Sequence, residues 1–87
     1  MFNILIVEDD KNIQKLMTEV LITDGYKVTS AFNGIEALDV LEQKQIDLII
    51  LDIMMPKMNG FEFAKTLKNN NAFIPILVIT ARQLSKD

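Results

Sequence analysis

The chain has 87 residues, of which 49% are hydrophobic, and a net charge of −3 at pH 7. This apolar content excludes intrinsic disorder, while the apolar runs are much shorter than the roughly 20 residues needed to span a membrane. The absence of cysteine and histidine excludes disulfide bonds, thiolate metal sites and catalysis by a histidine of this chain. Because lysine and arginine form no cluster, we expect no direct binding of nucleic acid by this segment.

The first part of the chain predicts a strand followed by a helix. Residues 2–7 are apolar at nearly every position, which is typical of a strand covered on both faces. Asp9 or Asp10 is expected to cap the helix, and Gly25 to end it. Apolar residues recur along this helix at helical spacing, at Ile13, Leu16, Met17, Val20 and Leu21.

A second strand and a second helix follow. Residues 26–32 alternate weakly between apolar and polar side chains and predict the strand. Asn33, with Glu36 three residues later, is close to a capping box, so we expect the helix to begin there. Its apolar face starts with Ile35 and Leu38, and the helical pattern ends at about residue 44.

The remaining residues predict two more strands with a third helix between them. Residues 47–51 form a buried apolar run and residues 75–79 another, and each is typical of a strand. Between them, the spacing of Phe61, Ala64 and Leu67 indicates a helix. Strands and helices therefore alternate along the whole chain, which predicts an α/β fold with parallel strands and helices packed on the sheet.

Acidic and hydroxyl side chains stand where the predicted strands end. Glu8, Asp9 and Asp10 follow the first strand, Asp52 follows the third, and Thr80 follows the fourth. Ligands of open parallel sheets bind beyond these carboxyl ends. Clustered carboxylates repel one another unless a cation neutralises them, and Mg²⁺ suits a site with two or three protein oxygens. An aspartate after a strand is also a common helix cap, and both roles stay open for Asp10.

Four motifs resemble the receiver domain of two-component response regulators: LIVEDD at residues 5–10, NGIEAL at 33–38, DLIILDIMMPKMNG at 47–60 and PILVITA at 75–81. The resemblance covers essentially the whole chain and is nearest to receivers that precede winged-helix DNA-binding domains. It implies a flavodoxin-like parallel sheet with helices on both faces and strand order 2-1-3-4, in which the family's fifth strand and last helices are missing from the chain. Residues 1–87 are then a receiver domain that is incomplete at its C-terminus.

The resemblance also implies a metal site and a phosphorylation site. Asp52 matches the aspartate that is phosphorylated. Mg²⁺ is expected to bind Asp9 and Asp52 directly, with Glu8 as the acidic partner that acts through water. The backbone carbonyl of Met54 matches a further metal ligand. Because Asp10 aligns just outside the acidic pair, the resemblance favours the cap role for it.

The remaining roles implied by the resemblance concern the phosphoryl group and its source. Thr80 matches the hydroxyl that moves onto the phosphoryl group, and Ala81 matches the small residue whose backbone N–H also reaches it. The donor is expected to be a sensor histidine kinase, and phosphorylation of Asp52 to switch an output domain, with transcription regulation as the expected output. The chain is thus expected to be a cytoplasmic signalling module, not an enzyme with a separate substrate.

Two departures from the family lead to further expectations. The family's fifth-strand lysine has no counterpart, so the alternative function is a receiver that acts only as a protein-interaction module. The fourth strand becomes an apolar edge, which favours self-association through this strand or exchange of helices between copies. A phosphatase or dehalogenase-like hydrolase is disfavoured, because such enzymes carry the nucleophile on the first strand and an acid or base two residues later, where this chain has Met54.

Overall fold

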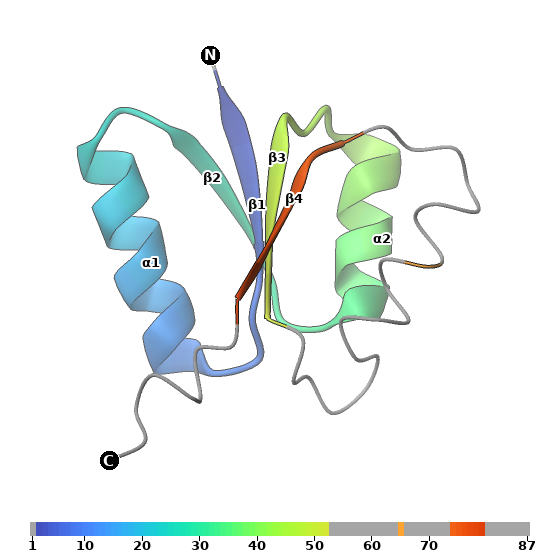
Figure 1. Cartoon of the computed structure of the whole chain (residues 1–87), viewed down its shortest axis with the longest axis horizontal. Coiled ribbons are helices and arrows are strands. Elements are labelled where there is room, and N and C mark those ends of the chain that lie inside the picture. The colour runs from blue at the N-terminus through green and yellow to red at the C-terminus, as the bar shows by residue number, and fades with distance from the viewer. Residues whose placement is uncertain (1, 53–64, 66–73, 80–87) are drawn as a thin grey trace.

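The chain forms a parallel sheet with a helix on each face in the computed structural model, which describes residues 2–52, 65 and 74–79 (Figure 1). The elements in chain order are β1 (Asn3–Val7), α1 (Lys11–Thr23), β2 (Lys27–Ala31), α2 (Gly34–Gln43), β3 (Leu48–Asp52) and β4 (Ile76–Ile79). The sheet order is β2-β1-β3-β4 with every pair parallel. The predicted α/β class and strand order are therefore confirmed.

The two described helices lie on opposite sides of the sheet, α1 on one face and α2 on the other (Figure 1). The third helix predicted from the sequence falls outside the described residues except for Lys65, which is helical and exposed. Within the described part of the chain, neither helix combines the length and the apolar character that crossing a membrane requires.

The hydrophobic core lies between the sheet and α2. It consists of buried side chains from β1, β2, β3, α2 and the residue that precedes β3 by two positions, namely Leu5, Val7, Ala31, Ala37, Ile46, Ile49 and Leu51. Successive strand residues point to opposite faces, so Ile4 and Ile6 of β1 face the side of α1, and both are buried. The prediction that the first strand is covered on both faces is therefore confirmed.

Capping interactions fix both ends of α1. The Asp10 carboxylate accepts hydrogen bonds from two backbone N–H groups of the first turn, at 2.9 and 3.1 Å, so Asp10 and not Asp9 is the cap. At the other end Gly25 has a φ of 93°, and its N–H donates to the carbonyl of Ile22 at 2.9 Å. The next N–H donates to the carbonyl of Leu21, which completes a Schellman motif and confirms the predicted end of the helix.

The start of α2 differs slightly from a capping box. Asn33 is the cap, and its side-chain oxygen accepts a hydrogen bond from the Glu36 N–H at 2.9 Å. The Glu36 carboxylate reaches one residue further back than a standard box, to the N–H of Phe32 at 2.8 Å. The helix thus begins where the sequence predicts, and its Glu36 carboxylate binds the first residue after β2.

β3 begins one residue later than predicted and includes Asp52. Asp47 precedes the strand, and its carboxylate accepts a hydrogen bond from the N–H of Asn3, the first residue of β1, at 2.8 Å. Its own backbone N–H donates to the carbonyl of Asn3, also at 2.8 Å. These two bonds set the register of β1 against β3, and with it the alignment of the two carboxyl ends.

Candidate functional site

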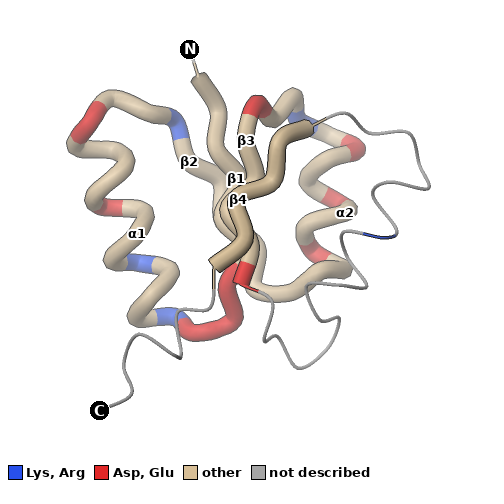
Figure 2. Tube along the Cα trace, viewed as in Figure 1, with Lys and Arg blue, Asp and Glu red and all other residues tan. Residues whose placement is uncertain are grey.

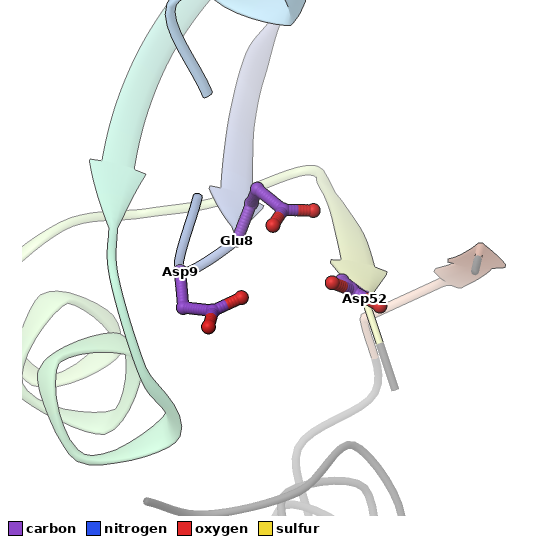
Figure 3. A group of neighbouring side chains, drawn as sticks. All are labelled: Glu8, Asp9 and Asp52. Atoms are coloured by element: carbon purple, nitrogen blue, oxygen red, sulfur yellow. The ribbon is translucent and has the colours of Figure 1, made fainter. Parts of the chain in front are cut away.

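The carboxyl ends of β1 and β3 bring acidic side chains together. Val7 is paired with Leu51 in the sheet, so the residues that follow each of them, Glu8 and Asp52, emerge side by side. Figure 2 shows acidic segments after β1 and at the end of β3, at the same end of the sheet. One carboxylate oxygen from each of Glu8, Asp9 and Asp52 lies within 4.8 Å of the others. Figure 3 shows the three side chains where β1 and β3 end. We call these three residues the acidic cluster.

Burial differs among the members of the acidic cluster. Glu8 and Asp52 have no exposed surface, whereas Asp9 is half-buried. Water can therefore weaken the repulsion among the three charges only from the side of Asp9. Three ionised carboxylates in such a place destabilise one another, and either a proton or a cation must reduce the negative charge.

Glu8 is the member whose pKa shows the clearest effect of this environment. Burial, and to a smaller extent the charge of Asp52, raise the pKa of its carboxyl from 4.5 to about 7, although the hydrogen bond from the Asp10 backbone N–H acts to lower it. That hydrogen bond reaches Oε2 at 3.0 Å. The other oxygen, Oε1, is buried and has no hydrogen-bond partner among the described residues. Glu8 thus offers a buried oxygen that a proton or a cation would satisfy.

The acidic cluster fits a hard divalent cation. The side-chain atoms that could bind a metal here are all carboxylate oxygens. Mg²⁺ and Ca²⁺ prefer such ligands, whereas softer metals do not require them. Among the described residues three contribute, and Mg²⁺ commonly retains several waters beside one or two carboxylates. The Glu8 oxygen without a described hydrogen-bond partner and the small number of ligand residues are therefore both consistent with Mg²⁺, the metal that the sequence predicts here.

The structure brings together three of the predicted site residues, namely Glu8, Asp9 and Asp52. The other three, Met54, Thr80 and Ala81, lie outside the described residues, so the expectations for them stay predictions.

One residue beside the acidic cluster was missed by sequence reasoning. Gln14 of α1 is buried, and its side-chain amide donates to three backbone carbonyls, one of them that of Glu8. A glutamine inside an amphipathic helix normally indicates a solvent-facing position. The only signal for its burial is its spacing of three and seven residues from Met17 and Leu21, which places it on the apolar face.

The raised pKa of Glu8 predicts how the metal-free protein responds to pH. Because the folded state holds the proton more tightly than the unfolded chain, the contribution of Glu8 to stability is complete below about pH 4.5 and is lost as pH rises through about 7. Replacement by Gln removes this loss, because a neutral amide has no proton to lose over this pH range. We expect Glu8→Gln to raise the free energy of unfolding more at pH 7.5 than at pH 5, in EDTA.

Urea unfolding of the wild type and Glu8→Gln at the two pH values measures this difference directly. Titration of the carboxyl groups that lie away from the acidic cluster is common to both proteins and cancels. A stability difference that does not change with pH would show that Glu8 titrates normally in the folded protein.

Comparison with known proteins identifies the family. Residues 4–87 match the response regulator receiver domain. A probable transcriptional regulator, ycf29 of Pyropia yezoensis, is 43% identical over 88 residues, an alignment that covers 99% of this chain and 40% of the relative. The chain thus spans less than half the length of this curated relative.

Solved structures give the same result. The chain is 40% identical to response regulator protein TrrA in its crystal structure with histidine kinase ThkA, with a TM-score of 0.85 over 93% of this chain and 70% of the other. It is 38% identical to TrrA of Thermotoga maritima in complex with Mg²⁺ and BeF, with a TM-score of 0.84 over 90% of this chain and 68% of the other. Receivers are signalling modules of two-component systems rather than conventional enzymes. The chain belongs to the family of response regulator receiver domains.

Proposed function

We propose that the chain is a phosphoacceptor whose Asp52 takes a phosphoryl group from the phosphohistidine of a partner kinase. The observation that carries the proposal is the acidic cluster at the carboxyl ends of β1 and β3, in which Asp52 is fully buried beside Glu8 and Asp9. Asp9 is its partly exposed member, so a donor approaches from that side. Transfer requires a local rearrangement that exposes an oxygen of Asp52.

The chemistry is a displacement at phosphorus. An oxygen of the Asp52 carboxylate forms a bond to phosphorus, the bond between phosphorus and the donor's imidazole nitrogen breaks, and the electron pair stays on that nitrogen. The product is an acyl phosphate, a known type of covalent carboxylate intermediate. Charge repulsion between the carboxylates and the incoming group opposes this reaction, and phosphoryl transfer depends mainly on positioning and on offsetting that charge.

Mg²⁺ is the proposed cofactor. Glu8, Asp9 and Asp52, with the backbone carbonyl of Met54, would hold it, and when bound it supplies positive charge against this repulsion. The relative TrrA, crystallised with Mg²⁺ and BeF, supports this choice. The Thr80 hydroxyl and the Ala81 backbone N–H are proposed to bind the phosphoryl oxygens, on the basis of the motif resemblance alone.

The proposed partner is a sensor histidine kinase, and the proposed output is regulation of transcription in the cytoplasm. The complex of TrrA with histidine kinase ThkA supports the first. The printed description of the relative from Pyropia yezoensis as a probable transcriptional regulator supports the second. Residues 1–87 are proposed to act together as one receiver domain.

Phosphorylation by acetyl phosphate tests the assignment of Asp52. With Mg²⁺ present, we expect intact-mass spectrometry to find one added phosphoryl group on the wild type and none on Asp52→Asn. Asp9→Asn should lose most of the adduct, because it removes a carboxylate of the acidic cluster. Asp10→Asn is the matched control: it removes a neighbouring charge, but asparagine caps a helix as well as aspartate does.

An adduct of unchanged yield in Asp52→Asn would place the phosphorylation elsewhere. Equal losses in Asp9→Asn and Asp10→Asn would show that general negative charge, and not the acidic cluster, supports the reaction.

We further propose that two copies of the chain associate through β4. Among the described strands β4 pairs only with β3, which makes it an edge of the sheet. Leu77 and Val78 on this strand are 53% and 51% exposed. A second β4 would pair with the backbone groups that no described strand bonds, and its side chains would lie beside Leu77 on one face of the sheet and Val78 on the other.

Sedimentation velocity at increasing concentration tests this association. We expect the wild type to dimerise and Val78→Lys to stay monomeric, because a lysine on an edge strand opposes pairing. Ile22→Lys is the matched control, since Ile22 is similarly exposed, at 55%, but lies on α1. A monomeric wild type over the whole range would contradict the proposal.

A further inference from the structure

We propose that Gln14 is a positioning residue for the acidic cluster: its side-chain amide fixes the backbone that carries Glu8 and Asp9. The inference rests on the proposed function for the role of the cluster, but its structural basis is independent of that role. Gln14 lies in the first turns of α1, is 3% exposed, and carries the only buried side chain of that helix.

The amide of Gln14 is surrounded by carbonyl groups. Its Nε2 lies 3.1 Å from the carbonyl oxygen of Ile6, 3.3 Å from that of Glu8 and 3.0 Å from that of Ala31. Backbone carbonyls only accept hydrogen bonds, so the atom that faces them must be the nitrogen, with its two protons shared among three acceptors. The other amide atom, Oε1, faces the hydroxyl of Thr18, a donor, at 3.5 Å.

These three carbonyls belong to the place where β1 and β2 end. Ala31 is the last residue of β2, and its carbonyl also accepts the hydrogen bond of the Glu8 N–H at 3.0 Å. Beyond this point the ladder between the two strands stops. The Gln14 amide therefore continues the hydrogen bonding past the end of the ladder and joins β1, β2 and α1 at one buried point.

Gln14 also holds the residues on both sides of Asp9. Its side chain donates to the carbonyl of Glu8, and its backbone N–H donates to the carbonyl of Asp10 at 2.9 Å. Glu8 is then restrained at its N–H, its carbonyl and its carboxylate, the last by the Asp10 N–H. Asp9 lies between two restrained peptide groups. The bond to Asp10 is an ordinary helix bond that any residue at position 14 would make, so the restraint specific to glutamine is that of its side chain on the Glu8 carbonyl.

If Gln14 only stabilised the fold, its replacement would affect Mg²⁺ binding differently. Loss of the buried hydrogen bonds lowers the free energy of unfolding in either case. As long as the protein stays folded, however, a general loss of stability leaves metal affinity unchanged. A positioning role predicts a loss of affinity beyond that of an equally destabilised control, comparable to the roughly tenfold effects of removing groups that orient metal ligands.

The test compares Gln14→Met with the wild type. Methionine is similar in length and unbranched, but has no donor for the three carbonyls. Calorimetric titration with MgCl₂ should show an affinity about tenfold weaker. Exchange of the Asp10 amide proton, which is bonded to the Glu8 carboxylate, should become at least several-fold faster. Ile46→Val is the control for lost stability, because Ile46 is buried in the core before β3 begins, at the end of the strands opposite the cluster.

Each outcome decides between the two roles. Weaker Mg²⁺ binding and faster Asp10 exchange in Gln14→Met, with Ile46→Val like the wild type, support positioning. Wild-type affinity and exchange in Gln14→Met overturn it. If the wild type itself binds no Mg²⁺, the proposed metal site fails, and Asp10 exchange alone then decides whether Gln14 restrains the strand end. If Gln14→Met does not fold, Gln14→Asn, whose amide is one methylene too short to reach all three carbonyls, takes its place in the same measurements.

Discussion

Three carboxylates repel one another at one end of the sheet, and the surrounding elements hold them together against this repulsion. Glu8, Asp9 and Asp52 lie within 4.8 Å of one another, and two of them have no exposed surface. The raised pKa of Glu8 is the direct result of that burial. A protein retains such an arrangement only if something else offsets its cost, and strained or repulsive groups of this kind are typical of functional sites. Here a divalent cation is the partner proposed to offset the repulsion.

The fold supplies the rigidity that holds these charges together. β1 and β3 are buried neighbours, and their backbone pairing is enough to place Glu8 beside Asp52. The capped start of α1 places the Asp10 N–H against the Glu8 carboxylate. The Gln14 amide then joins α1 to the ends of β1 and β2 through its three hydrogen bonds. The opposite end of the sheet is fastened by Asp47 and Asn3, so the register cannot slip without breaking bonds at both ends.

The strands and the acidic cluster could be predicted from the sequence because both depend on simple patterns. Short apolar runs identify the strands. Parallel strands place their last residues at one edge of the sheet, and this rule predicts that Glu8 and Asp52 lie close together. The choice of Asp10 over Asp9 as the cap required the resemblance, since adjacent aspartates look alike locally. Gln14 could not be predicted, because the carbonyls that it binds come from β1 and β2, and no local pattern encodes a contact across 17 residues. Thr80 stays a prediction, as it lies outside the described residues.

Anomalous diffraction can show whether the acidic cluster binds a divalent cation. Crystals of the chain soaked in MnCl₂, in which Mn²⁺ substitutes for Mg²⁺, should give an anomalous peak in contact with the carboxylates of Asp9 and Asp52, and crystals of Asp9→Asn should lose it. A map with no peak at the acidic cluster, or a peak there that persists at full height in Asp9→Asn, would contradict the account.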